Sequence, residues 1–377
     1  MFFLKNHARA RAHTLAPFTL VLCSALAGTL SAMDYTLVFN PTHIQAIQSP
    51  DTKWDFRTVQ FSPIDNDLLA AEVNAKVVLL KRHQMLGWGI TNIIKNQTTR
   101  TIFDLAFSRD GTTLVAPFWG GAEILKKEPD QPWHWAEKCL DRVVGAWDVN
   151  CARFNHRGNL LAYGTGYGGI LLSPYTKTGI DQKQLWSYTC KSCKDGHEPY
   201  GIPSIAFSPD DTTLGSSCKD STVKLWEQKN KKSNASWQCT KTLKMDDDSG
   251  YPLAFLNNAL LVTSNATGTM QVHNKKDDDW KLIQTLAAHK SYITGLVVPC
   301  AIPGGPDLIS GSWDTTLKFW QLAQNTLKCI KTVLLNHVIW GISVSPDGTI
   351  LAATLSNKTL ELWSLFSHNE KKRGRNE

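Results

Sequence analysis

The thirteen residues Leu308-Ile-Ser-Gly-Ser-Trp-Asp-Thr-Thr-Leu-Lys-Phe-Trp320 decide the fold of this chain. They contain two short runs in which apolar side chains alternate with small or polar ones, and the polar turn Asp314-Thr315 separates the runs. A period of two is typical of β-strands, and a polar turn between two such runs is typical of a hairpin. We therefore predict a strand, a turn and a second strand over these positions.

The same thirteen positions recur along the chain. Leu214–Trp226 is a close second copy, and Leu351–Trp363 follows with Asn357 in the Asp position. The copies stand 43 to 53 residues apart. Their leading residues are Leu69, Leu114, Leu161, Leu214, Leu261, Leu308 and Leu351. Each copy follows another apolar alternation that ends in an aromatic residue or Val, often followed by Ser-Pro-Asp as in Ser208–Asp210. The chain is therefore built of seven similar units.

Each unit predicts four strands. Three come from the repeated pattern, and a more polar fourth strand occupies variable segments such as Trp88–Gln97 and Trp237–Leu243. A four-stranded sheet exposes an apolar face unless copies stack, and radial stacking closes into an all-β, seven-bladed β-propeller. The seventh copy has no fourth strand after it. We predict that an N-terminal strand at Tyr35–Phe39 completes this last blade and removes its exposed edge.

These motifs resemble the WD-repeat family over residues 34–366. The Asp-x-x-apolar-x-apolar-Trp ending is complete in the fourth and sixth copies, and the seventh copy has Asn357 for Asp. Copies one, two, three and five lack both Asp and Trp at these positions. The residues that replace Trp there are Lys81, Lys126, Ser173 and His273. The resemblance implies a rigid propeller that works as a binding platform.

The resemblance also implies a structural role for residues that otherwise suggest a Ser-His-Asp hydrolase. In WD-repeat blades these positions form a hydrogen-bond network, which satisfies buried polar atoms that would each cost about 1–3 kcal/mol if left unpaired. A Gly-x-Ser-x-Gly nucleophile motif is absent from the sequence. The residues assigned to this network are His289, Ser310, Asp314 and Trp320, with Asp220 and Trp226 in the fourth copy and Trp363 in the seventh.

The family resemblance places partner binding on the face that carries the turns just before the Asp position. Trp119 and Trp313 occupy that turn position in two copies and Lys219 occupies it in a third. Tryptophan is uncommon in turns and enriched at binding hot spots. Tyr292 and Trp340, at the starts of inner strands, are candidates for the same rim. The alternative is that the two turn tryptophans only cover neighbouring blades.

Composition and the absence of certain motifs exclude several classes of function. The net charge of +7 includes Lys5, Arg9 and Arg11 near the N-terminus, and the remainder is too balanced for a nucleic-acid binder. No phosphate-binding loop, dinucleotide fingerprint or HExxH motif occurs. We therefore predict a non-catalytic scaffold without a cofactor, which binds a peptide or partner protein on the propeller face and works within a complex.

The alternative is an exported propeller enzyme of the lactonase or hydrolase type, with a metal ion in its central channel. Such enzymes place acidic or His residues at the starts of inner strands. Here the candidates are Asp104, Asp148 and His337, which do not recur in a common column.

Cys190, Cys193 and His197 resemble half a zinc site, but zinc requires a fourth ligand and no second CxxC pair exists. We predict no metal here. A local disulfide, in an exported protein, and free thiols are the other two interpretations of the cysteine pair.

The termini are predicted to lie outside the propeller. Residues 1–32 have the basic, apolar and small-residue order of a secretory signal, and the apolar run is too short to predict an integral membrane span. A mitochondrial transit peptide is a second interpretation. The third is that Met33 is the true start of a cytoplasmic protein. We assign residues 33–366 to the propeller and residues 367–377 to a disordered basic tail.

Overall fold

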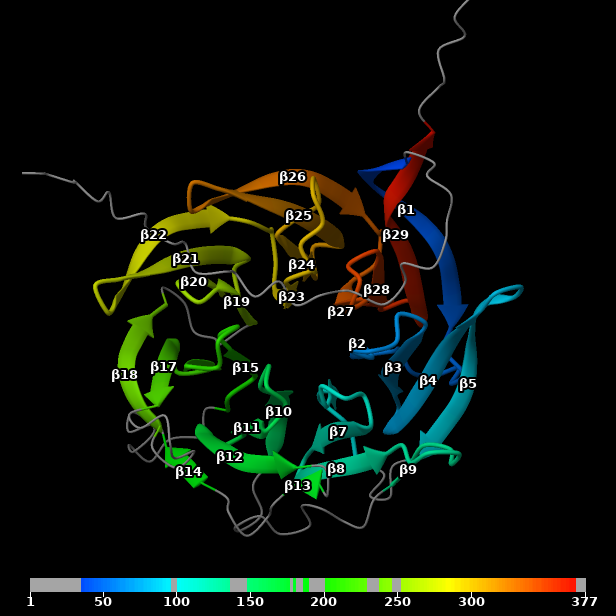
Figure 1. Ribbon diagram of the computed structural model, residues 1–377, viewed down its shortest axis with the longest axis horizontal. Helices are drawn as coiled ribbons and strands as arrows, with labels where there is room; N and C mark the ends of the chain where they lie inside the picture. The colour runs from blue at the N-terminus through cyan, green and yellow to red at the C-terminus, as the bar shows by residue number, and fades with distance from the viewer. Residues whose placement is uncertain are drawn as a thin grey trace, which may run out of the picture.

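The computed structural model describes residues 35–95, 100–135, 148–176, 179–180, 186–189, 201–228, 237–245 and 252–370. These residues form seven antiparallel sheets arranged in a ring around a central channel (Figure 1). The described part of the chain contains no helix long and apolar enough to cross a bilayer. The predicted all-β, seven-bladed propeller is confirmed.

The first three blades follow the repeat pattern from the inner strand outwards. The first blade consists of β2 (Val59–Phe61), β3 (Leu68–Val73), β4 (Lys76–His83) and β5 (Gly87–Lys95). The second consists of β6 (Ala106–Phe107), β7 (Thr113–Phe118), β8 (Gly121–Lys126) and β9 (His134–Trp135). The third has five strands, β10 (Val149–Phe154), β11 (Leu160–Thr165), β12 (Gly169–Thr176), β13 (Gly179–Ile180) and β14 (Trp186–Thr189).

Blades four to six are regular four-stranded sheets. The fourth consists of β15 (Ser204–Phe207), β16 (Thr213–Cys218), β17 (Thr222–Gln228) and β18 (Trp237–Lys244). The fifth consists of β19 (Leu253–Asn257), β20 (Leu260–Ser264), β21 (Thr269–Lys276) and β22 (Asp279–Ala287). The sixth consists of β23 (Ile293–Val297), β24 (Leu308–Ser312), β25 (Thr316–Ala323) and β26 (Thr326–Leu334).

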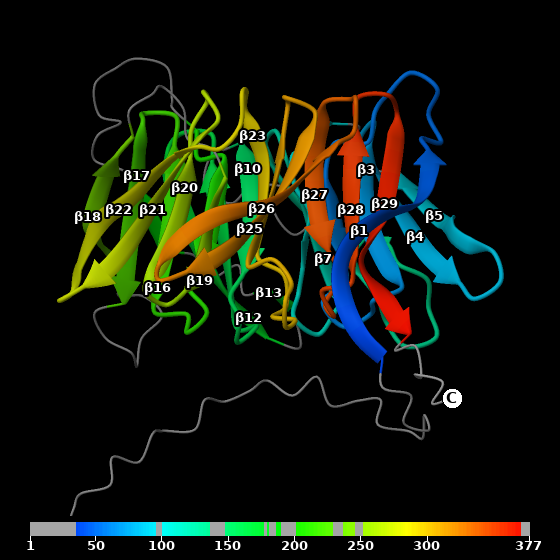
Figure 2. The same cartoon turned by 90° about the horizontal axis from the view of Figure 1, so that it is seen from above.

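The seventh blade joins the two ends of the described chain. It contains β27 (Ile339–Val344), β28 (Ile350–Leu355) and β29 (Thr359–Glu370), and its outer strand is β1 (Tyr35–Gln48). Strands β1 and β29 lie side by side in both views (Figures 1 and 2) and pair from Tyr35 opposite Glu370 to Gln48 opposite Thr359. The predicted closure by an N-terminal strand is therefore confirmed.

Both closing strands are longer than their sequence patterns indicate. The pattern gave β1 only Tyr35–Phe39, but pairing resumes at Thr42 after an irregularity that includes Pro41. The register shifts once more between His43 and Gln45, and pairing continues to Gln48. Proline lacks the N–H that a ladder position needs, so it interrupts the alternation without ending the strand. Strand β29 continues to Glu370, so the predicted propeller boundary at residue 366 falls inside this strand.

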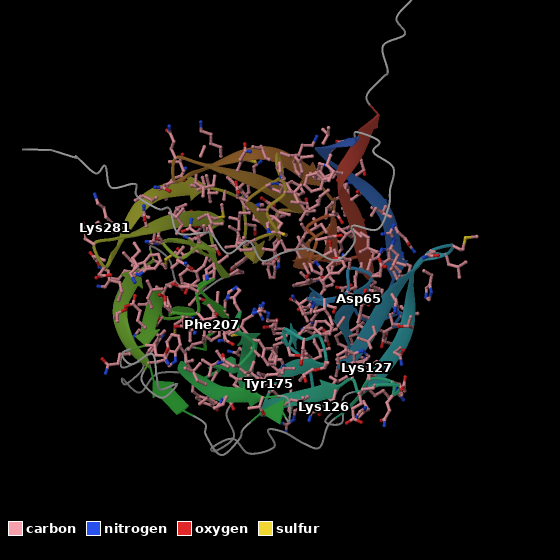
Figure 3. All side chains as sticks on the ribbon, in the orientation of Figure 1. Asp65, Lys126, Lys127, Tyr175, Phe207 and Lys281 are labelled. Carbon is pink, nitrogen blue, oxygen red and sulfur yellow. The ribbon has the colours of Figure 1, made fainter. Side chains whose placement is uncertain are left out.

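The core lies between the blades. Phe61 and Val78 of the first blade pack in one buried cluster with Ala352 and Leu362 of the seventh. Figure 3 shows side chains filling the spaces between neighbouring sheets; the labelled Phe207 belongs to the cluster between blades three and four. The second strand of each blade is buried on both faces, which explains why these strands read as nearly continuous apolar or small-residue runs.

In three blades the turn between the first and second strands has the same hydrogen bonds. In the second, fourth and seventh blades a Ser hydroxyl donates to the carboxylate two residues later, and it also accepts a backbone N–H from the start of the second strand. The Ser-to-Asp pairs are Ser108–Asp110 at 2.6 Å, Ser208–Asp210 at 2.7 Å and Ser345–Asp347 at 2.6 Å. The Ser-x-Asp sequence that these three turns share is thus a turn that hydrogen-bonds its own backbone.

Candidate functional site

The turns between the second and third strands of every blade lie on one face of the disc, at the top in Figure 2. The loops that join one blade to the next reach the same face, which we call the upper face. Trp119 and Trp313 both lie in its turns, and each is a large side chain with substantial exposure, 63% for Trp119 and 40% for Trp313. Monomer surfaces seldom expose such residues without a binding role when they are clustered.

Three of the predicted partner-binding residues form one cluster. The ring of Trp313 lies 4.8 Å from that of Tyr292 and 5.5 Å from that of Trp340, measured between centroids, and both pairs meet edge to face. The indole Nε1 of Trp340 donates to Asp55 Oδ2 at 3.3 Å. Edge-to-face packing and this hydrogen bond fix the rings in place. We call Tyr292, Trp313 and Trp340 the aromatic cluster; it spans blades six and seven.

Trp119 and Lys219 lie on the same face but outside this cluster. The ring of Trp119, in the second blade, packs edge to face on Phe103 at 6.1 Å, and the Arg100 guanidinium donates to the Trp119 carbonyl. Lys219 lies in the fourth blade, where its backbone N–H donates to the Gly201 carbonyl at 3.2 Å and its side chain is exposed. The five candidates therefore share a face and occupy three separate places on it.

Sequence reasoning missed other exposed aromatic residues of the upper face, namely Trp54, Phe103 and Tyr167. Trp54 and Phe103 lie in loops that join one blade to the next, which are outside the turn column of the repeat. Tyr167 stands one position after that column. The alternation of strand directions places the interblade loops on the same face as those turns. The position of Trp54 and Phe103 on the upper face could therefore have been predicted from the strand order.

In the sixth blade the predicted structural residues form one continuous hydrogen-bond network. His289 Nδ1 lies 3.0 Å from Asp314 Oδ2, and His289 Nε2 lies 2.7 Å from Ser310 Oγ. The Trp320 indole donates to the same Ser310 oxygen at 2.9 Å. Burial lowers the pKa of His289, and the Asp314 carboxylate offsets this only in part. The Ser310 hydroxyl thus has two buried hydrogen-bond partners, His289 and Trp320.

Among the described residues, part of the same network is seen in the fourth blade. Trp226 donates to Ser216 Oγ at 2.9 Å, and Asp220 accepts from the backbone N–H of Thr222 at 3.0 Å. In the seventh blade the assignment of Trp363 to the network is wrong. Its indole donates instead to Glu361 Oε2 at 3.1 Å, because Ala353 stands where the other two blades have Ser and offers no acceptor.

The fifth blade contains a related pair that the Trp pattern did not reveal. His273 stands in the Trp column, and its Nε2 lies 3.3 Å from the hydroxyl of Thr263, which stands in the Ser column. Burial lowers the pKa of His273 to about 4. The fifth blade thus keeps the link between second and third strands with a neutral imidazole in place of an indole.

Comparison with known families agrees with this geometry. The family model "WD domain, G-beta repeat" matches residues 188–227, 280–321 and 327–364, which contain the Trp ends of the fourth, sixth and seventh blades. The chain is a seven-bladed β-propeller that contains three WD repeats.

Curated relatives of this WD-repeat propeller include two fungal proteins. The nuclear distribution protein PAC1 of Arthroderma otae is 28% identical over 175 residues, which cover 45% of this chain and 36% of that protein. The nuclear distribution protein PAC1-2 of Uncinocarpus reesii is 29% identical over 175 residues, covering 45% of this chain and 37% of that protein. The match therefore spans little more than a third of the length of these relatives.

A solved structure supports the fold. A chain in the crystal structure of a mitotic checkpoint complex superimposes with a TM-score of 0.65 at 18% identity, and the match covers 91% of this chain and 100% of that chain. At this identity the likeness shows the fold alone.

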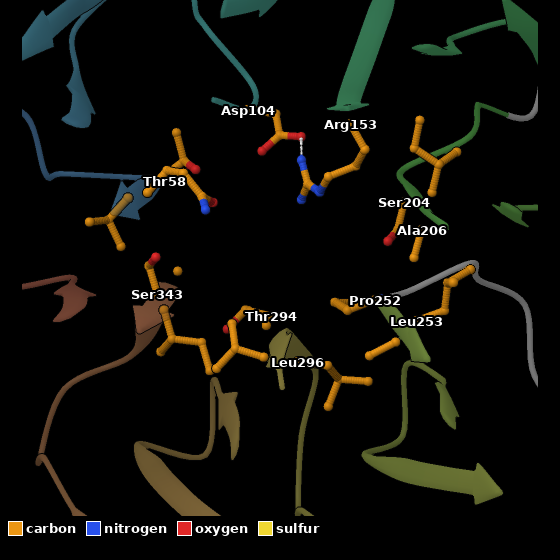
Figure 4. A pocket seen from close by; sticks show the side chains of 18 of the residues that line it. Thr58, Asp104, Arg153, Ser204, Ala206, Pro252, Leu253, Thr294, Leu296 and Ser343 are labelled. Atoms are coloured by element: carbon orange, nitrogen blue, oxygen red, sulfur yellow. Dashed lines mark hydrogen bonds and ion pairs between the residues drawn. The ribbon is translucent and has the colours of Figure 1, made fainter. Parts of the chain in front are cut away.

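The central channel of the WD-repeat propeller holds a cavity of about 510 Å³. Among the described residues that line it, Asp104 supplies the single carboxylate, and this pairs with the Arg153 guanidinium (Figure 4). The backbone N–H groups of Leu105 and Ala152 also donate to Asp104, at 2.9 and 3.2 Å. Asp148 and His337 do not belong to this lining.

The remaining candidates from the sequence lie partly outside the described residues. Cys190, Cys193 and His197 fall outside them, as do residues 1–34 and 371–377, so the interpretations of the cysteine pair and of the termini stay predictions. Within the described ranges no group of three or more His, Cys, Asp or Glu side chains is placed to hold a metal ion.

Proposed function

We propose that this WD-repeat propeller is a non-catalytic scaffold that binds a peptide or partner protein on its upper face through the aromatic cluster. The observation that carries the proposal is the contact of Trp313 with both Tyr292 and Trp340. Three large rings fixed on a solvent-facing rim resemble the anchors that dominate protein interfaces, because aromatic side chains bury much area at small cost in side-chain entropy.

The names of the relatives support a place in a protein assembly. PAC1 is named as a nuclear distribution protein, and the structural neighbour belongs to a mitotic checkpoint complex. We propose by analogy that this chain also works within a complex. Because the match covers 36% of PAC1, the identity of any partner does not transfer with the name.

The chemistry of the channel argues for a scaffold over the alternative of a metal-dependent hydrolase. A catalytic metal needs several oxygen or nitrogen ligands and an open coordination position. The carboxylate of Asp104 already accepts hydrogen bonds from Arg153 and two backbone N–H groups. A metal ion there would have to compete with a guanidinium held against the same oxygens.

Selection from a random peptide library displayed on phage, with the purified propeller immobilised, tests the proposal. We expect enriched peptides whose affinity falls by about tenfold or more for Trp313→Ala and for Trp340→Ala, as befits hot-spot residues. Met85→Ala is the matched control, because Met85 is a large, 94% exposed side chain in the β4–β5 turn on the opposite face.

Thermal unfolding of each variant checks that the propeller remains folded. Equal losses for Trp313→Ala and Met85→Ala, or selected peptides that bind both tryptophan variants as tightly as the original protein, would contradict binding at the aromatic cluster. Trp119→Ala adds a further comparison, since a loss confined to this variant would move the site to the second blade.

A further inference from the structure

A second cavity opens on the lower face of the disc, opposite the aromatic cluster. It has a volume of about 450 Å³ and lies between the turns of the second and third blades. Two arginines from these neighbouring turns contribute to it, and the labelled Tyr175 at the end of β12 marks its place in Figure 3. The residues that line it are Arg109, Asp110, Arg157, Gly158, Tyr175 and Thr176.

Both arginines stand at turn positions where the fourth and seventh blades have other residues. Arg109 stands where the fourth and seventh blades have Pro209 and Pro346, and Arg157 stands where those blades have the Asp that accepts the Ser hydroxyl. Within the third blade, the Asn155 side chain takes the place of the Ser hydroxyl. Its Oδ1 accepts the backbone N–H groups of residues 159 and 160 at 3.0 and 2.9 Å. The carboxylate of this turn comes from Asp211 of the fourth blade, which accepts the backbone N–H groups of His156 and Arg157 at 2.7 and 2.8 Å, so position 157 can carry a cation.

The arginine side chains are directed by contacts with the following blade. Arg109 donates to the carbonyl of His156, and Arg157 Nη2 donates to the carbonyl of Asp210 at 3.3 Å. Gly158 allows the close approach of Arg109, since a Cβ at Gly158 would lie 3.0 Å from Arg109 Cβ. A guanidinium carries five N–H donors, so one interblade hydrogen bond leaves most of them for a ligand.

The nearby carboxylates are already hydrogen-bonded. Burial alone would raise the pKa of Asp110, but hydrogen bonds from Ser108 and Thr112 outweigh it and hold this pKa below its usual range. Asp211 Oδ2, 3.9 Å from Arg157 Nε, accepts the backbone N–H of Arg157 at 2.8 Å. The two guanidinium groups thus keep donors for an anion from outside, and the side chain of Arg157 is 70% exposed.

We infer that this pocket binds a phosphate group on a serine, threonine or tyrosine side chain of a partner peptide. Arginine recognises phosphate through paired, charge-assisted hydrogen bonds, and two arginines can share one dianion. The pocket volume lies in the range of ligand sites and leaves room for the residue that carries the phosphate. The lining holds two arginines and the Asp110 carboxylate, and it lacks the cluster of several basic side chains that an anionic lipid surface attracts, which favours a peptide.

This site is independent of the upper-face proposal, because it lies on the other face and in other blades. A degenerate peptide library with a central phosphoserine or phosphotyrosine, and the same library with unmodified residues, provides the probe. Binding to the full chain is measured by fluorescence anisotropy. We expect binding only with the phosphate, weakened about tenfold by Arg109→Gln or Arg157→Gln and abolished in the double variant.

Arg82→Gln is the matched control. Arg82 is an exposed arginine in β4 of the first blade, and its replacement makes the same change in net charge. An equal loss with Arg82→Gln would overturn the site in favour of general charge attraction. Two further results would overturn it: no preference for the phosphorylated library, or arginine-dependent binding to vesicles containing phosphoinositides in the absence of peptide binding.

Discussion

The side-chain amide of Gln45 forms two hydrogen bonds with the backbone of Trp88. Its Nε2 donates to the Trp88 carbonyl at 2.8 Å, and its Oε1 accepts the Trp88 N–H at 2.9 Å. Gln45 belongs to β1 of the closing blade and Trp88 to β5 of the first. Gln284 of β22 makes the same pair of bonds with Leu327 of β26, at 3.0 and 2.8 Å. The N-terminal strand therefore contacts its neighbour as an ordinary outer strand does.

Gln45→Ala is expected to lower the free energy of unfolding by about 1–3 kcal/mol, because two partly buried backbone groups lose their partner. Gln284→Ala should cost a similar amount, since its geometry is the same. Urea unfolding followed by tryptophan fluorescence measures both. Gln84→Ala, at an exposed turn position, is the control and should change stability by less than about 0.5 kcal/mol. Similar costs for all three variants would show that the hydrogen bonds of Gln45 and Gln284 do not stabilise the contact between blades.

Ser310→Ala should destabilise the protein more than Ser216→Ala. Removing the Ser310 hydroxyl strips a partner from both His289 and Trp320. The Ser216 hydroxyl accepts from one buried side chain, the Trp226 indole, and donates to the Lys224 carbonyl at 3.5 Å. A buried polar group without a partner costs about 1–3 kcal/mol, so we expect roughly twice the loss at Ser310. Chemical denaturation of the two variants tests this order. Equal losses, or the reverse order, would show that the His contributes nothing to the network.

Acid should weaken the fold through His273. The pKa of this buried imidazole falls from 6.5 to about 4, so between these values the unfolded chain takes up a proton that the folded chain does not. Stability is then lost as pH falls from about 6.5 to 4, by about 3 kcal/mol in total. His273→Gln should remove this part of the pH dependence. His83→Gln, at an exposed position, should leave the profile unchanged.

Glu72 should produce the opposite dependence over nearly the same interval. Burial raises its pKa to about 7, and one carboxylate oxygen lacks a hydrogen-bond partner. The folded state therefore favours the protonated acid, and stability falls as pH rises from about 4.5 to 7. Glu72→Gln should raise the free energy of unfolding, relative to the original protein, by about 3 kcal/mol more at pH 8 than at pH 5. The exposed Glu128→Gln is the control, and an identical effect there would contradict the assignment.

The repeat pattern predicted the fold because each blade repeats the same local alternation of apolar and polar side chains, which marks its buried strands. The closing strand was predicted for the same reason, but its second half was not, because Pro41 interrupts the alternation. The packing of Trp313 against Trp340 was not predictable in this way, because it depends on how two neighbouring blades are turned toward each other. The error at Trp363 was avoidable: Ala353 in the Ser column already showed that the indole had no hydroxyl to meet.

The lower-face arginines were missed because a repeat pattern contains what the copies share, while Arg109 and Arg157 are where two copies differ. Residues that differ between the copies do not recur, so a search for recurring positions does not find them. The structure shows that the two arginines belong together, because the neighbouring turns hold both side chains beside one cavity.

The pairing of β1 with β29 also sets the order of events on the ribosome. Strand β1 is synthesised before any blade, and its partner follows all the others, so β1 has no native neighbour within its sheet while six blades emerge. Closing so long a loop carries an entropic cost and delays folding, and an unpaired apolar strand invites wrong pairing meanwhile. Nascent chains of this protein should therefore depend on chaperones until translation has passed Glu370.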